Sequence, residues 1–166
     1  MAVNQSDGLT AAQHRRLVAA IPAVAEMCDR LAAYAVPESL HHNDLHDANI
    51  FYNNGDFQFF DWGNSSIAHP FFWLRTVFVS IEYTFGLEED DPVYDEFARA
   101  CLQPWAQFET DENLWEAYKL ARQLWSLSTA VKYKTQMQLI EGMREEYATA
   151  VPGLLQEFLD ANPQLS

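Results

Sequence analysis

The stretch Leu40–Asn64, LHHNDLHDANIFYNNGDFQFFDWGN, holds the most informative pattern in the chain. Its first half places three histidines and two aspartates within seven consecutive residues that begin at His41. Its second half consists of two short runs rich in aromatic residues, separated by Asn53-Asn54-Gly55-Asp56. Asn-Gly between such runs is the strongest short-range signal for a β-hairpin. We therefore predict a polar loop over residues 41–49 and a hairpin over residues 49–61.

The segments on both sides of this stretch have the spacing of helices. Upstream, apolar residues recur at helical spacing from Thr10 to about Ala35, and Thr10 is a suitable cap. Pro22 interrupts that pattern, which predicts a break or a kink. The chain is thus predicted to be one mainly α domain, residues 1–166, with a small β-hairpin. The helical block over 70–162 is expected to contain helices at 70–86, 92–108, 112–135 and 138–161.

The charge balance and the cysteines narrow the class of protein. The net charge is −14, with 10 basic and 24 acidic residues, so the chain lacks the basic stripe of a nucleic-acid binder. An anionic membrane surface would repel it for the same reason, whereas a small cationic substrate would be attracted. Cys28 and Cys101 suggest no disulfide framework, and the first residues do not resemble a signal peptide. A cytoplasmic location is therefore predicted.

One interpretation of the loop is a zinc site. Histidine and aspartate are common zinc ligands. An extended loop does not by itself bring alternating side chains onto one ion, and His69 is the only later histidine. Zinc stays as the weaker alternative. Its candidate ligands would be His41, His42, Asp44, His46 and Asp47.

A second interpretation rests on spacing. Asp44 follows His42 by two residues, Asn49 follows Asp44 by five, and Asp61 comes at the far end of the hairpin. Phosphoryl transfer from ATP needs one carboxylate to orient the attacking hydroxyl. It also needs hard oxygen ligands, such as an amide and a second carboxylate, to hold magnesium against the phosphates. The sequence offers these groups in that order.

The motifs HNDLHDAN and DWG resemble the H-x-D-L-x-x-x-N and D-F-G motifs of the protein-kinase-like fold. With the tail NSSIAHPFFWL, they are more similar to the aminoglycoside phosphotransferase and choline kinase-like family. The resemblance implies that Asp44 is the catalytic base and that His42 supports the catalytic loop, 41–49, through backbone hydrogen bonds. It implies that Asn49 and Asp61 bind Mg²⁺ and, through it, ATP. His46 falls where many relatives have histidine.

The same resemblance implies transfer of phosphate to a hydroxyl of a small, cationic molecule such as an aminoglycoside or an amino alcohol. The chain departs from the family pattern at two places. Asn43 stands where glycine is common, and His69-Pro70 stands where many relatives carry Asp-Pro. Because that aspartate usually supports the catalytic loop, the support is expected to come from elsewhere. Acidic residues after the hairpin are candidates for binding the substrate: Glu82, Asp90, Asp91 and Asp95.

The resemblance covers the helical C-terminal lobe of the kinase-like fold, and the N-terminal β-lobe is expected to be absent. Only 40 residues precede the loop, Lys119 is the first lysine, and Gly8 is the only glycine before the loop. The nucleotide-clamping lysine and the glycine-rich loop therefore have no upstream counterpart here. We expect a missing β-lobe or a second copy of the chain as partner, and weak nucleotide binding without one. The alternative is a catalytically inactive binding or assembly module.

Overall fold

The computed structural model describes residues 8–87, 91–139 and 150–165. They fall into two compact units. The terminal unit comprises Met1–Ala33 with Gln123–Ser166, and the central unit comprises Tyr34–Arg122. This division into units does not test the prediction that the chain is a single domain. Among the residues described, no helix is both long and apolar enough to cross a membrane.

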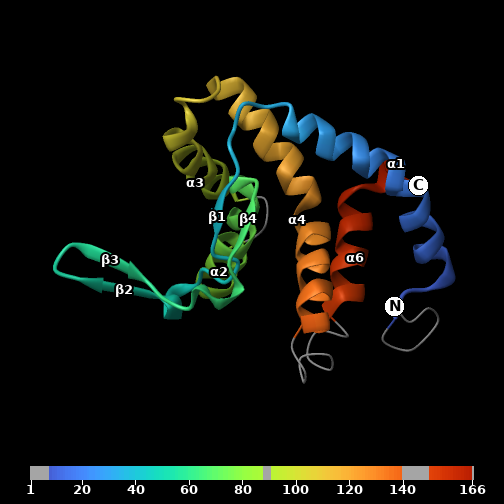
Figure 1. Ribbon diagram of the computed structural model, residues 1–166, viewed down its shortest axis with the longest axis horizontal. Coiled ribbons are helices and arrows are strands. Elements are labelled where there is room, and N and C mark those ends of the chain that lie inside the picture. The colour runs from blue at the N-terminus through green and yellow to red at the C-terminus, as the bar shows by residue number, and fades with distance from the viewer. Residues whose placement is uncertain (1–7, 88–90, 140–149, 166) are drawn as a thin grey trace. The chain divides into compact units, whose positions relative to one another are not determined.

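The terminal unit is helical (Figure 1). It contains α1 (Ala11–Ala32), the second part of α4 (Asp111–Leu139), and α6 (Ala150–Ala161). Thr10 caps α1 in a capping box with Gln13, and the helix continues through Pro22 without a break. A small apolar core holds the unit together, formed by Leu9, Ala130, Val151, Leu154 and Leu155.

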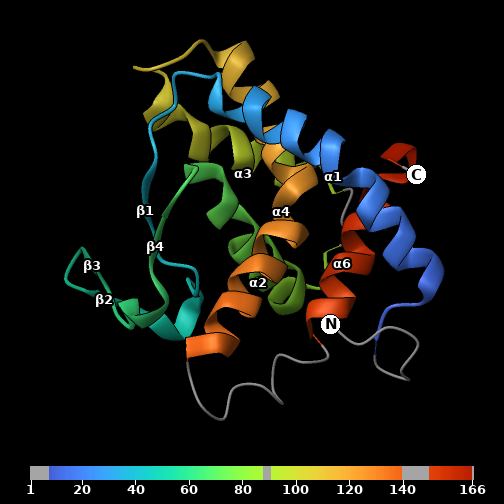
Figure 2. The same ribbon diagram turned by 45° about the vertical axis from the view of Figure 1, so that its right-hand side comes forward.

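The central unit carries all the strands found among the described residues. They form two antiparallel pairs, β1 (Ser39–His41) with β4 (Ser66–Ala68), and β2 (Ile50–Asn53) with β3 (Asp56–Phe59). The first pair runs side by side in both ribbon views (Figure 1 and Figure 2). The pairs are followed by α2 (Leu74–Phe85), α3 (Pro92–Leu102) and the first part of α4. The predicted mainly α fold with a small hairpin is confirmed.

Aromatic side chains fix the helices of the central unit. The Phe78 ring of α2 lies 5.1 Å from the Tyr94 ring of α3, measured between ring centroids. The Arg99 guanidinium of α3 lies 3.9 Å from the Trp115 ring centroid of α4, at cation–π distance. Phe71, in a short 3-10 helix at Pro70–Trp73, is almost fully buried and packs edge-on against Trp105. These contacts anchor the segment that follows β4.

The hairpin formed as its sequence predicts. Asn54 and Gly55 both have positive φ, 52° and 96°, which the tightest hairpin turns require. The helix predicted over 92–108 is shorter, because α3 ends at Leu102 and a 3-10 turn, Gln103–Trp105, follows it. The helix predicted over 112–135 is longer, because α4 continues to Leu139. The predicted helix over 138–161 lies partly outside the described residues, and α6 accounts for its end.

The pairing of β1 with β4 corrects the sequence-based prediction. The sequence predicted a loop over residues 41–49 and no strands besides the hairpin, yet Ser39–His41 pairs with Ser66–Ala68. Strands of three residues are too short to show a period of two. Their partners are also more than twenty residues apart in the chain, so the pairing depends on tertiary structure.

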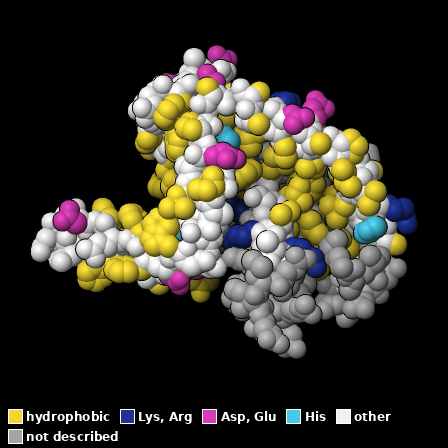
Figure 3. Space-filling view, viewed as in Figure 1, with side chains coloured by type: hydrophobic (Ala, Val, Ile, Leu, Met, Phe, Trp, Pro, Cys, Tyr) yellow, Lys and Arg dark blue, Asp and Glu magenta, His cyan; other side chains and the backbone are white. Residues whose placement is uncertain are grey.

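One face of the hairpin is apolar and exposed. The register pairs Ile50 with Phe59 and Tyr52 with Phe57, so these four side chains share a face. Tyr52 and Phe57 are 61% and 63% exposed. Figure 3 shows hydrophobic side chains along the hairpin, which in Figure 1 extends away from the helices of its unit. A two-stranded hairpin is marginally stable alone in water, so this face is suited to a covering partner.

Candidate functional site

The predicted site residues occupy two loops that the strand pairs bring together. Residues 42–49 connect β1 to β2, and residues 60–65 connect β3 to β4. The pairs His41–Ser66 and Ile50–Phe59 therefore join the loops at both ends. The Phe60 N–H donates to the Asn49 carbonyl at 3.0 Å, which extends the second pair by one bond. Asp61 thus directly follows a residue bonded to Asn49.

His42 joins the same two loops through its side chain. It is 5% exposed, and its Nε2 lies 2.7 Å from the Phe60 carbonyl oxygen. A carbonyl can only accept, so Nε2 carries the proton and donates. The ring also packs against Trp62, with 4.6 Å between centroids. Both backbone polar groups of Phe60 are therefore bonded: its N–H to the Asn49 carbonyl and its carbonyl to the His42 ring.

Asn43 occupies a backbone conformation that explains its residue type. Its φ is 66°, in the left-handed region that glycine and asparagine tolerate best. Its Nδ2 donates to the Asn64 carbonyl at 2.7 Å and to Ser66 Oγ at 2.8 Å. Asparagine at this position keeps the conformation that glycine would allow and adds two hydrogen bonds across to the second loop.

Asp44 and Asn49 are brought together within the first loop. Asn49 Nδ2 donates to the Asp44 carbonyl oxygen at 2.8 Å. The Asp44 side chain is 42% exposed, and its Oδ1 lies 3.9 Å from His46 Nε2. A carboxylate with this exposure can meet a ligand from solvent, as a catalytic base must.

Asp61 is exposed and has a strained backbone. Its φ and ψ are 56° and 60°, a left-handed conformation outside the usual range for a residue with a Cβ. Such strain often occurs where a side chain must point in one direction for function. The carboxylate makes no capping hydrogen bond to the short 3-10 helix Trp62–Asn64 that it precedes.

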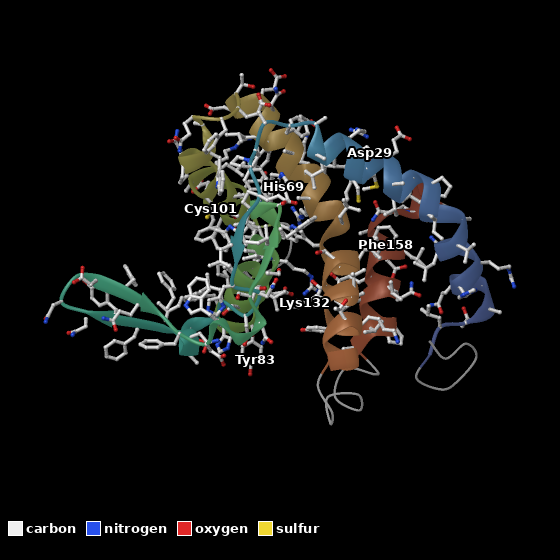
Figure 4. The ribbon with its side chains drawn as sticks, in the orientation of Figure 1. Asp29, His69, Tyr83, Cys101, Lys132 and Phe158 are labelled. Atoms are coloured by element: carbon white, nitrogen blue, oxygen red, sulfur yellow. The ribbon has the colours of Figure 1, made fainter. Side chains whose placement is uncertain are left out.

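His69 has a structural environment. It directly follows β4 and is labelled in Figure 4. Its Nδ1 accepts a hydrogen bond from the Phe71 N–H at 3.3 Å, and its ring meets Phe71 and Phe72 edge-on. Burial lowers the pKa of His69 to about 4, so the ring is neutral near pH 7. It cannot replace the charge of an aspartate, and the hydrogen bonds of His42 and Asn43 tie the loops together instead.

The donor atoms at the junction of the loops suit magnesium better than zinc. Among residues 8–87, 91–139 and 150–165, no three or more histidine, cysteine, aspartate or glutamate side chains are grouped to hold a metal ion. The zinc alternative therefore lacks a ligand set in the part of the chain described. The amide of Asn49 and the carboxylate of Asp61 supply hard oxygen donors, the type that Mg²⁺ prefers. Their roles as ligands, and those of Asp44 and His42 in catalysis, stay predictions.

The sequence of the chain matches a known protein family. The model of the phosphotransferase enzyme family matches residues 2–112, more than half of the 166 residues. The chain belongs to this family, which implies a kinase-like phosphotransferase activity in general. Members of the family generally use ATP and Mg²⁺. No curated protein and no solved structure matches the chain.

We predict that Asn43→Ala destabilises the chain more than Asn43→Gly. Both substitutions remove the two hydrogen bonds of Asn43, at about 0.5–1.5 kcal/mol each. Only alanine adds the cost of a left-handed backbone, about 1 kcal/mol. Urea unfolding followed by circular dichroism measures the difference. Equal losses in the two variants would show that the positive φ places no constraint on this residue.

We predict that His69 makes the chain less stable as the pH falls from 6.5 towards 4. The unfolded chain binds the proton at the ordinary pKa of 6.5, whereas the folded chain resists it until about 4. The loss should be on the order of 1–2 kcal/mol, because the ring keeps some hydration. The asparagine side chain of a His69→Asn variant cannot titrate, although it can still accept from the Phe71 N–H.

The measurement is the free energy of unfolding of the wild type and His69→Asn across this pH range. The wild type should lose stability relative to the variant as the pH falls. Parallel curves would contradict the burial of a neutral His69.

Proposed function

We propose that this chain is the helical lobe of an ATP-dependent small-molecule kinase, which phosphorylates a hydroxyl group of a small, cationic substrate. The observation that carries the proposal is the double attachment of Phe60, to Asn49 through its N–H and to His42 through its carbonyl. This attachment puts the loop with Asp44 and Asn49 beside the segment that begins with Asp61. Aminoglycosides and amino alcohols are the substrate classes that the family resemblance favours.

In this proposal each residue has one role. Asp44 orients the acceptor hydroxyl and takes its proton as the hydroxyl oxygen bonds to the γ-phosphorus of ATP. The bond between the γ-phosphorus and the β–γ bridging oxygen breaks in the same step, and ADP leaves with that oxygen. Asn49 and Asp61 supply oxygen ligands to Mg²⁺, which neutralises charge on the phosphates when bound. His42 holds the two loops together through its bond to the Phe60 carbonyl.

The preference for a cationic substrate rests on charge. The net charge is −14, and Glu82 and Asp95 are exposed on α2 and α3. Asp91 is less suitable, because its Oδ1 caps α3 by accepting from the Val93 N–H at 2.9 Å. Asp90 lies outside the described residues.

A cytoplasmic location is part of the proposal and is supported by the two free cysteines, Cys28 and Cys101.

The second candidate function is an inactive binding or assembly module. One observation favours it: within these 166 residues every lysine follows Asp61, beginning with Lys119. Lys119 Nζ lies 2.5 Å from Glu116 Oε1 on the same helix. The sequence before the loop therefore supplies no lysine for the α- and β-phosphates of ATP.

We predict that the 166-residue chain alone binds Mg²⁺–ATP weakly and transfers phosphate very slowly. Loss of one preorganised electrostatic contact commonly lowers the rate by about 10² to 10³. Loss of the lysine and of the phosphate-covering loop together should cost on the order of 10⁵ or more. ATP affinity should fall towards the millimolar range, where magnesium and a few side chains hold the phosphates.

Two measurements check this prediction. Millimolar Mg²⁺–ATP should raise the melting temperature of the wild type but not that of Asp61→Asn, which keeps the size of the side chain without its charge. A sensitive ATP-consumption assay with amino-sugar and amino-alcohol acceptors should give almost no signal above an Asp44→Asn blank. No melting shift in the wild type would favour the inactive module. Robust turnover that Asp44→Asn abolishes would show a complete enzyme.

We further propose that a β-rich lobe or a second copy of the chain covers the apolar hairpin face of Ile50, Tyr52, Phe57 and Phe59. Three of these side chains are exposed and Ile50 is half-buried. Burying apolar area stabilises an interface by about 25 cal/mol per Å², so such a face favours association.

We predict that the chain alone self-associates through this hairpin face. Replacing Tyr52 and Phe57 together by threonine keeps β-propensity and removes two exposed rings. The double variant should show a lower weight-average mass than the wild type in sedimentation equilibrium from micromolar to hundreds of micromolar protein. The matched control is Tyr83→Thr, because Tyr83 is also exposed but lies on α2. A wild type that stays monomeric throughout would exclude the second copy as partner.

A further inference from the structure

His46 lies among the proposed catalytic and magnesium-binding side chains. Its Nε2 is 3.2 Å from Asn49 Nδ2 and 3.9 Å from Asp44 Oδ1. On the other side of the ring, Nδ1 is 3.7 Å from Asp47 Oδ1. The side chain is 39% exposed and lies at the start of the short 3-10 helix Asp47–Asn49. Each ring nitrogen therefore faces a different group.

The hydrogen bonds of Asn49 determine which way its amide points. The Asp44 carbonyl oxygen can only accept, so the Asn49 atom 2.8 Å from it must be the amide nitrogen. That nitrogen carries two hydrogens and also lies 3.2 Å from His46 Nε2. His46 Nε2 is therefore the acceptor. In the neutral ring the proton is then on Nδ1, the nitrogen that faces Asp47.

Both hydrogens of the Asn49 amide nitrogen thus have a partner within the loop. The Asn49 amide oxygen has no hydrogen-bond partner among the residues that the structure describes. Rotating the amide by 180° would set this oxygen against the Asp44 carbonyl oxygen, so that two acceptors would oppose each other. The Asp44 carbonyl therefore selects the orientation, and in that orientation His46 Nε2 accepts the second hydrogen.

We propose that His46 is a positioning residue that holds the Asn49 amide with its oxygen free to bind Mg²⁺. This inference rests on the proposed function, because it takes Asn49 as a magnesium ligand. The Asp44 carbonyl accepts one hydrogen of the Asn49 amide nitrogen, and His46 Nε2 accepts the other. Groups that orient a metal ligand in this way commonly contribute 10- to 100-fold to metal affinity.

The test is the binding of Mn²⁺ alone to the full chain, followed by electron paramagnetic resonance of the free ion. His46→Leu removes the acceptor, and we expect the Mn²⁺ affinity to fall about 10-fold or more. His46→Gln is the matched control, because its side-chain oxygen can accept from Asn49. We expect His46→Gln to retain most of the wild-type affinity. Circular dichroism melting of each variant shows whether the fold is kept.

A double-mutant cycle separates positioning from a general structural effect. In an Asn49→Ala background, His46→Leu should cause no further loss of Mn²⁺ affinity, because the amide that it orients is gone. Equal losses from His46→Leu with and without Asn49 would overturn the inference. So would a His46→Gln variant as weak as His46→Leu.

The failure of the proposed function has a different signature. If Asn49→Ala and Asp61→Asn both bind Mn²⁺ as the wild type does, or if the wild type binds none, then the magnesium site itself is wrong and the inference falls with it. If those two variants lose affinity and His46→Leu does not, then the site is supported and only the role of His46 is overturned.

Discussion

The central unit depends on how the residue Phe60 is held. Its N–H donates to the Asn49 carbonyl, and its own carbonyl accepts from the buried His42 ring. These bonds attach the end of the hairpin to both ends of the loop before it. Without them the position of Asp61 relative to Asp44 and Asn49 would depend only on the strand pairs and on the two bonds of Asn43 to the second loop. Two hydrogen bonds to Phe60 thus help to fix the relation between the two loops that carry the predicted catalytic and magnesium-binding residues.

The two departures from the family pattern, at Asn43 and His69, both concern the side chains that hold the catalytic loop in place. In many relatives an aspartate after the D-W-G or D-F-G motif supports the catalytic loop, but here a neutral histidine occupies that position. Asn43 makes two bonds across to the second loop, to the Asn64 carbonyl and Ser66 Oγ. The two loops of this chain are thus held together by several neutral hydrogen bonds. Neutral hydrogen bonds are individually weaker than charge-assisted ones, but they avoid the desolvation of a buried carboxylate.

The site combines a firmly held backbone with exposed chemical groups. His41 and His42 are buried at the end of β1, whereas Asp44 is partly exposed and Asp61 is exposed. This division suits a phosphotransferase, because the groups that contact ligands must stay accessible while the buried part of the loops keeps them at a fixed spacing. The apolar hairpin face is the opposite case, since the Tyr52 hydroxyl is the one polar side-chain group among its four exposed or half-buried residues. This contrast agrees with the proposal that the loops serve chemistry and the hairpin face serves association.

The sequence by itself determined the residue types of the site, the hairpin and the principal helices. Asn54-Gly55 selects its turn locally, and capping and apolar spacing act within a few residues, so these features can be recognised without tertiary contacts. Only the tertiary structure decided the pairing of β1 with β4 and the neutral state of His69. Each of these depends on groups brought together by folding, a distant strand in the first case and a buried environment in the second. Hydrogen bonds and desolvation depend on which groups lie within a few ångströms of one another. For residues far apart in the sequence, their spacing along the chain does not reveal this proximity.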